Sequence, residues 1–257
     1  MMPRPPHVPL DLLVEDAGSQ GCLGHIPALP GLCFRAKTVT EAEANAPARI
    51  EEYLAWLRSE NLTDLTRETA DAARAGGSAR IIAAECVPGA PVWDSGNAAA
   101  LFEHDLRPLD DVSVAAHLRF VRRVLDRIRA AAASLSAAER GCRPAPNRRS
   151  IDETLEHVGN CIWWYCSRID DRLPEPDEPE GESWLDRIDR LFDGAARHLL
   201  GTSLSARAEI HVPSRFPTND PNERWTHAKV CRRQAEHVWV HLPGVEAAVS
   251  TAWKHGT

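Results

Sequence analysis

Four long amphipathic segments dominate the sequence from residue 113 to the C-terminus. Apolar residues recur there every three or four positions, over residues 113–135, 150–173, 183–200 and 223–242. That spacing places apolar side chains along one side of an α-helix. Ser150, with Glu153 three residues later, predicts a capping box at the start of the second helix, and Pro243-Gly244 predicts the end of the fourth. Helices of this length predict an all-α four-helix bundle over 113–257.

The first 90 residues predict an α+β domain with a small antiparallel sheet and one helix. Short alternating or apolar runs predict strands within 7–16 and 22–38, and a further strand over 79–87. Between them, Thr40 with Glu43 predicts a capped helix whose apolar face carries Ala46, Ile50, Tyr53, Leu54 and Leu57. The stretch that follows is rich in Pro, Gly and Asp, so residues 91–112 are expected to connect the two domains.

Composition narrows the classes of function. The formal net charge of −7 disfavours broad binding to nucleic-acid phosphates. No window approaches the roughly 20 apolar residues needed to cross a bilayer, and the N-terminus does not resemble a signal peptide. The seven cysteines include no CxxC pair, so most should be small buried thiols in a reducing compartment. We therefore predict a cytoplasmic protein that binds neither nucleic acid nor membranes.

Two histidines in the last segment, His237 and His241, are candidates for a metal site. Residues four apart on a helix have β-carbons about 5–6 Å apart, so both imidazoles can reach one ion. A pair alone is weak evidence in a chain with eleven histidines. A third ligand would have to come from another helix, where His117, His157 and His198 are available, or from His227. His157 stands out because it lies two turns into the helix that begins at Ser150.

The order of these histidines resembles that of a known family. The segment RRSIDETLEHVGNCIWWYCSRIDD and the later WTHAKVCRRQAEHVWVH are similar to the second and last helices of the DinB/YfiT-like metalloenzyme superfamily. This resemblance covers roughly 112–257 and implies that His157, His237 and His241 are the metal ligands. One position departs from the family pattern, because Arg149 stands where a Trp usually precedes the serine.

The N-terminal domain has a separate resemblance. Residues 20–60, and above all the P-x-L-P-G core at 27–31, are similar to the HicB antitoxin-like fold. In antitoxins such a module binds a toxin and is followed by a DNA-binding segment, and no such segment is evident in this sequence. We therefore expect a structural or substrate-covering module. The expected division of the chain is a HicB-like domain over 1–90, a connection over 91–112 and a DinB-like bundle over 113–257.

The DinB resemblance implies an S-transferase that uses a divalent metal to activate a low-molecular-weight thiol. Zn is the preferred metal, and Ni, Fe or Co also suit an open three-histidine site. The sequence is rich in Ala and Arg and has almost no Lys, which suggests a high-GC genome. Such a genome favours mycothiol as the thiol, acting on a small molecule in secondary metabolism or detoxification. Two alternatives stay open: a hydrolase or isomerase that uses metal-bound water, and a non-catalytic protein-binding module. A homodimer is compatible with either.

Other residues near the three histidines are candidates for supporting roles. Glu153 can orient an imidazole or simply cap the helix, and Asn160 can bond a substrate hydroxyl. Cys161 is a further ligand, a reactive thiol or a buried spacer. Glu236 should be exposed, and the acidic segment 174–182 should be a solvated loop or a lid. Candidate residues for binding the thiol cofactor are Arg168, Arg232, Arg233 and Trp164.

Overall fold

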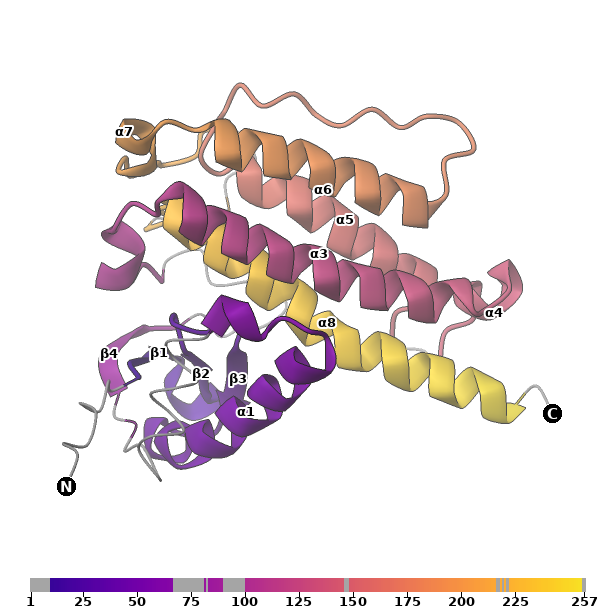
Figure 1. Cartoon of the computed structure of the whole chain (residues 1–257), viewed down its shortest axis with the longest axis horizontal. Coiled ribbons are helices and arrows are strands. Elements are labelled where there is room, and N and C mark those ends of the chain that lie inside the picture. The colour runs from indigo at the N-terminus through magenta and orange to yellow at the C-terminus, as the bar shows by residue number, and fades with distance from the viewer. Residues whose placement is uncertain are drawn as a thin grey trace.

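A computed structural model of the chain describes residues 10–66, 81, 83–89, 100–145, 148–215, 218, 220 and 222–255. A small sheet with one helix forms the N-terminal part, and the remainder is mostly helical (Figure 1). The sheet and α1 lie on one side of α8, and α5 and α6 lie beyond α3 and α8 on the other side. Within the described residues, no helix is both long and apolar enough to cross a bilayer.

The sheet has four strands in the order β3-β2-β1-β4. β2 (Cys22–His25) pairs antiparallel with both β1 (Leu12–Asp16) and β3 (Cys33–Ala36), but β4 (Ala83–Pro88) runs parallel to β1. The prediction of a purely antiparallel sheet is therefore wrong. The chain leaves β3, passes through α1, and returns at the opposite edge, and a crossover of this kind brings the last strand in parallel to β1.

α1 (Val39–Ser59) begins two residues earlier than predicted. Thr38 is the N-cap and accepts from the Glu41 amide at 3.1 Å, while the Glu41 carboxylate accepts from the Lys37 amide at 2.8 Å. Thr38 and Glu41 have the same spacing as the predicted Thr40 and Glu43, so the sequence allowed both. Glu43 accepts instead from the Ala83 amide at 2.9 Å and ties the helix to β4. The predicted apolar face, from Ala46 to Leu57, is buried as expected.

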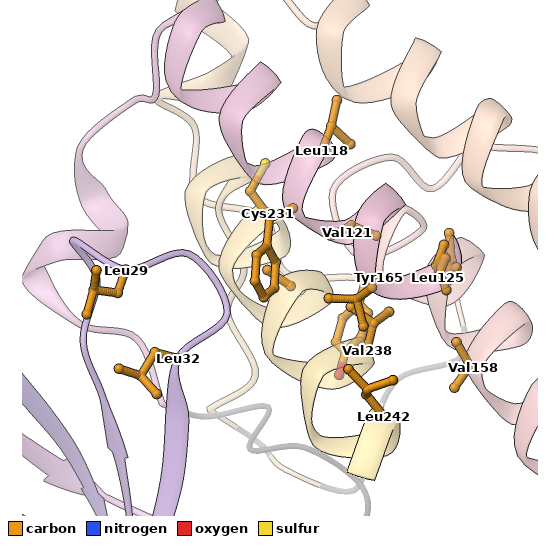
Figure 2. Packing of buried hydrophobic residues seen from close by; sticks show 14 of the residues in the cluster. Leu29, Leu32, Leu118, Val121, Leu125, Val158, Tyr165, Cys231, Val238 and Leu242 are labelled. Carbon is orange, nitrogen blue, oxygen red and sulfur yellow. The ribbon is translucent and has the colours of Figure 1, made fainter. Parts of the chain in front are cut away.

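Four long helices follow: α3 (Asp111–Ala133), α5 (Ile151–Cys166), α6 (Trp184–Gly201) and α8 (His227–His255). α3 packs against α8 and α6, and α5 packs against α6 and α8. The described residues also contain the short helices α4 (Ala137–Gly141) and α7 (Leu204–Arg207) and three 3-10 turns. Leu118, Val121 and Leu125 of α3, Val158 and Tyr165 of α5, and Cys231, Val238 and Leu242 of α8 form one apolar core (Figure 2).

The sequence predicted most of these helix limits. The capping box of Ser150 and Glu153 is confirmed, with both hydrogen bonds present. Of the predicted connection 91–112, residues 91–99 lie outside the described part. The rest contains a 3-10 turn, Glu103–Leu106, and the N-cap of α3, Asp110.

α8 does not end at Pro243, as the sequence predicted, but continues to His255. A proline in a helix removes one backbone hydrogen bond and crowds the preceding turn. Burial of Val245, which is 2% exposed, and an ion pair between Glu246 and Arg127 at 2.8 Å favour continuation past that point. Tertiary contacts therefore outweigh the local stop signal.

The two faces of the sheet differ in chemistry. Successive residues of a strand point to opposite faces. Leu12, Val14, Cys22 and Phe34 share one face and are buried in apolar surroundings. The other face carries Glu15, Leu23, His25, Cys33 and Arg35, because Leu23 pairs with both Glu15 and Arg35, and His25 pairs with Cys33. This polar face meets α8.

His25 is the centre of that contact and is completely buried. Its Nδ1 lies 2.6 Å from Glu236 Oε1 of α8, and its Nε2 lies 3.2 Å from Glu15 Oε1. Burial alone would lower the pKa of His25, but the carboxylates of Glu236 and Glu15 outweigh it and raise that pKa above its ordinary value. His25 is thus held as an imidazolium between a strand carboxylate and a helix carboxylate.

Two arginines of α8 complete the junction. Arg232 binds Asp105 at 2.7 Å and Glu236 at 3.3 Å, and Arg233 reaches Glu236 at 3.2 Å and Glu15 at 3.9 Å. The expectation that Glu236 is exposed is wrong, since only 3% of its surface is accessible. Burial would raise the pKa of Glu236, but His25 and the two guanidiniums lower it far below its usual range. The group therefore stays ionised while buried.

An apolar contact supports the same junction. Trp239 of α8 packs against Tyr53 and Trp56 of α1 and Phe120 of α3, with ring centroids 4.8–6.0 Å apart. Gly31 follows the Pro-rich turn with a φ of 84°, and a Cβ there would lie 2.2 Å from the Phe120 ring. Glycine alone therefore allows this turn to press against α3 and α8.

Replacing Glu236 with alanine should destabilise the fold by about 3–5 kcal/mol, because three buried cations lose a partner. Glu246→Ala is the matched control on the same helix, since Glu246 also pairs with an arginine but is 41% exposed. It should cost less than about 1 kcal/mol. The free energy of unfolding, measured by urea denaturation, checks both. Equal losses of unfolding free energy in Glu236→Ala and Glu246→Ala would show that the buried junction contributes no more stability than an exposed ion pair.

The junction should also make stability depend on pH. A group whose pKa is raised by folding stabilises the fold fully below its unfolded value, and that contribution is lost as the pH rises through the folded value. For His25, whose ordinary pKa is 6.5, the loss should begin above about pH 6.5. The measurement is the urea midpoint between pH 6 and pH 9 for the wild type and His25→Gln. The wild type should lose more stability over that interval than the variant, and parallel curves would refute the assignment.

Candidate metal centre

Three histidines converge where α5 faces α8. His157 lies on α5, and His237 and His241 lie on successive turns of α8. His237 Nε2 is 3.1 Å from His157 Nε2 and 3.2 Å from His241 Nε2. One nitrogen from each residue lies within 4.8 Å of the others, and all three side chains are half-buried. The structure thus brings together the three residues that the sequence predicted as ligands.

The spacing of the nitrogens fits a divalent ion. Two imidazole nitrogens at about 2.0–2.1 Å from a common ion, with a tetrahedral angle between them, are about 3.3 Å apart. The observed separations are close to that value. A three-histidine set leaves at least one coordination position for water or substrate, as in catalytic sites. Geometry and donor type therefore both suit zinc or a similar ion.

The protonation state of the site also suits a cation. Burial, followed by the neighbouring His241, His157 and Arg233, lowers the pKa of His237 well below its ordinary value. The imidazole is then neutral at physiological pH, and its nitrogen lone pair is available for a ligand bond.

Two cavities share the histidines. The first, which we call the sheet-side cavity, has a volume of about 540 Å³ and lies between β2, β3, α1 and α8. It is bordered by all three histidines. The second, the aromatic cavity, has a volume of about 420 Å³ and is bordered by His157 and His237. Its other walls are Asn160, Trp163, Trp164 and Tyr165 of α5 and the acidic segment before α6.

The four predicted cofactor-binding residues divide into two groups. Arg233 lines the sheet-side cavity and Trp164 lines the aromatic cavity. Arg168 and Arg232 line neither cavity, because both are buried in ion pairs. Arg168 lies 3.5 Å from Glu223, and its guanidinium stacks over Trp164 at 4.5 Å. Arg232 is held by Asp105 and Glu236. These two arginines therefore position other elements of the protein.

The supporting candidates on α5 also differ. Glu153 accepts from the Ser150 amide and pairs with Arg143, which lowers the pKa of Glu153 to about 2. Its place is that of a helix cap. Asn160 is exposed at the wall of the aromatic cavity, where its amide can contact a bound molecule. Cys161 Sγ lies 3.7 Å from His157 Nδ1, and burial raises the pKa of Cys161 to about 11, so it stays a thiol.

The acidic segment 174–182 has both a bridging and a lining role. Glu178 and Glu182 pair with Arg187 and Arg190 of α6, at 3.0 and 2.6 Å. Glu175, Pro176 and Glu178 also border the aromatic cavity. The segment is therefore anchored by ion pairs as a wall of that cavity.

Sequence reasoning did not identify several arginines beside the histidines. Arg35 of β3, Arg49 of α1, and Arg148 and Arg149 before α5 line the sheet-side cavity. One signal for them was present in the sequence: Arg149 occupies the position where the DinB pattern has Trp. For Arg35 and Arg49 no local signal existed, since only the packing of the sheet against α8 brings them to this cavity.

Part of the helical region is similar to a known family. Residues 121–243 match the family model of the DinB superfamily, a range that contains α5, α6 and all three histidines. The DinB-like part of the predicted resemblance is therefore confirmed. No curated protein and no solved structure matches the chain.

Purified protein should contain about one divalent ion per chain, and His237→Ala should contain none, because two imidazoles bind far more weakly than three. His198→Ala, which removes a histidine of α6 outside the cluster, is the control and should keep the metal. Elemental analysis after dialysis against Zn²⁺ provides the measurement. Full occupancy in His237→Ala would exclude the site.

Proposed function

We propose that this protein is a divalent-metal-dependent S-transferase, in which a low-molecular-weight thiol attacks, or exchanges with, a small-molecule substrate. The observation that supports this proposal is that the histidine cluster lies between two cavities of different chemistry, with all three histidines at the sheet-side cavity and His157 and His237 at the aromatic cavity. A transferase must bring two molecules to one reactive centre, and each cavity can admit one of them.

The donor set fits the chemistry of thiol activation. A free thiol has a pKa near 8.5, so only a small fraction is ionised at neutral pH. A divalent ion held by the three histidines would lower the pKa of a thiol at its open position. The chemistry that the ion would supply is a thiolate, whose sulfur would bond to an electrophilic carbon of the substrate while the leaving group departs with its electron pair and the thiol proton goes to solvent.

The residues of the two cavities orient the reactants. Trp163, Trp164 and Tyr165 offer apolar surface for one reactant, and Asn160 offers a donor and an acceptor. Tyr165 is held in place by burial, which raises its pKa to about 12 and keeps its hydroxyl protonated. On the other side, Arg233 offers a positive charge next to the histidines. These walls also reduce access of water to the reacting atoms.

The remaining details of the proposal come from the sequence. Mycothiol is the proposed thiol, Zn is the proposed ion, and a secondary-metabolic or detoxification step is the proposed setting. We further propose that residues 1–90 form a HicB-like domain without antitoxin activity, joined by residues 91–112 to a four-helix DinB-like bundle over 113–257. The protein would act in the cytoplasm.

Turnover of an electrophilic test substrate should require both metal and added thiol. A panel of small electrophiles with mycothiol, assayed for consumption of free thiol, is the direct test. We expect wild-type activity, unchanged activity in His198→Ala, and a loss of at least about 100-fold in His237→Ala because the bound ion is lost. Metal-dependent turnover that proceeds equally without thiol would instead identify a hydrolase. Normal thiol transfer by metal-free His237→Ala would exclude the proposed function.

A further inference from the structure

We propose that the sheet-side cavity binds a small molecule through a carboxylate or phosphate group, and that Arg35 of the N-terminal sheet and Arg149 before α5 hold that group beside the three histidines. This inference rests on the proposed function, because it specifies the chemistry of one of the two reactants. It also gives the N-terminal domain a direct part in binding.

Charge is the first evidence. Five arginines line the cavity, namely Arg35, Arg49, Arg148, Arg149 and Arg233, against two acidic residues, Glu52 and Glu236. The chain as a whole has a formal net charge of −7, whereas the side chains that line this cavity carry an excess of positive charge. A cavity lined by one sign of charge attracts ligands of the opposite sign.

The two acidic residues are already engaged. Glu52 pairs with Arg49 at 2.9 Å. Glu236 is buried between His25, Arg232 and Arg233. Among the described residues, neither Arg148 nor Arg149 forms an ion pair with a carboxylate, although sixteen of the described arginines do. The charge of Arg149 is therefore available to a ligand at the rim of the histidine cluster.

The register of the sheet explains how Arg35 reaches this place. Arg35 pairs with Leu23 across β2 and β3, so both side chains lie on the face that also carries His25. That face is held against α8 by the bond between His25 and Glu236, and both Leu23 and Arg35 line the cavity. Since Glu236 directly precedes His237, the same junction brings Arg35 to the cavity that the three histidines border.

The type of side chain indicates the type of ligand. A guanidinium has donors in a planar fork that matches the two oxygens of a carboxylate or phosphate, and such bonds are stronger than neutral ones. Arg35 and Arg149 come from different domains and can approach one oxyanion from two directions. A volume of about 540 Å³ is in the usual range for small-molecule sites and is too small for a folded partner.

Binding of two probes to the full-length, metal-depleted chain tests the inference. Inorganic phosphate and succinate are titrated calorimetrically at constant ionic strength, so that no bound metal contributes to either affinity. Arg35→Gln and Arg149→Gln should each weaken binding by about 10-fold or more, the equivalent of losing one charge-assisted hydrogen bond. Arg172→Gln is the control, since Arg172 is 96% exposed outside both cavities.

Arg35 is exposed, so its substitution should leave the fold intact, and Arg35→Lys offers a second variant that keeps the charge. It should bind with an affinity between those of the wild type and Arg35→Gln. Tighter binding of phosphate or of succinate identifies which oxyanion the cavity prefers, and either result supports the inference. Absence of binding of both probes to the wild type would overturn it, as would unchanged affinity in Arg35→Gln.

Metal content provides an independent readout. Arg35→Gln should retain about one ion per chain, because its side chain is not a ligand. Oxyanion binding that depends on Arg35 in a protein without affinity for metal would refute the proposed function and leave the anion site standing. If the protein binds metal but Arg35→Gln does not change its affinity for the oxyanions, the anion site is refuted and the proposed function stands.

Discussion

The bond between His25 and Glu236 is the contact on which the arrangement of this protein depends. It joins the polar face of the sheet to α8 at a distance of 2.6 Å, and both partners are buried. Glu236 and His237 are consecutive, and consecutive residues of a helix point about 100° apart. One side of α8 therefore holds the sheet through Arg232 and Glu236, while an adjacent side presents His237 and His241 to α5. Any shift of this helix would disturb both its junction with the sheet and the histidine cluster.

A junction built from charges differs in its consequences from one built from apolar residues. Removing several ionised groups from water is costly, and their mutual attraction repays that cost only when the geometry is right. His25, Glu15, Glu236, Arg232, Arg233 and Asp105 form their ion pairs only in the observed register. The apolar contact of Trp239 with α1 and α3 adds attraction without such a requirement. The ionic network thus specifies how the sheet sits on α8, and the aromatic cluster strengthens that association.

This geometry gives the sheet and the helical part a joint role. The helical part supplies the three histidines and the aromatic cavity, and the sheet closes a second, arginine-lined cavity on the other side of them. Neither part alone contains the complete set of walls. The helical part, of which residues 121–243 match the DinB superfamily model, thus has the sheet beside its histidines, and Arg149 lines the cavity between the two parts.

Much of this protein could be predicted from its sequence, because the relevant signals are local. Several features depend only on residues within one or two turns of each other. They are the capping box at Ser150, the apolar face of α1, the order of the elements, and the spacing of His237 and His241. The convergence of His157 on that pair followed from a family resemblance. Tertiary structure alone decided the parallel pairing of β4, the continuation of α8 past Pro243, the burial of Glu236, and the place of Arg35 beside the histidines. Each of these results depends on a partner distant in the sequence: β1 for the strand, α3 for the helix, His25 for the carboxylate, and α8 for the arginine. Local sequence patterns do not predict such partners, because packing and ion pairing contribute free energy only after folding has brought the distant residues into contact.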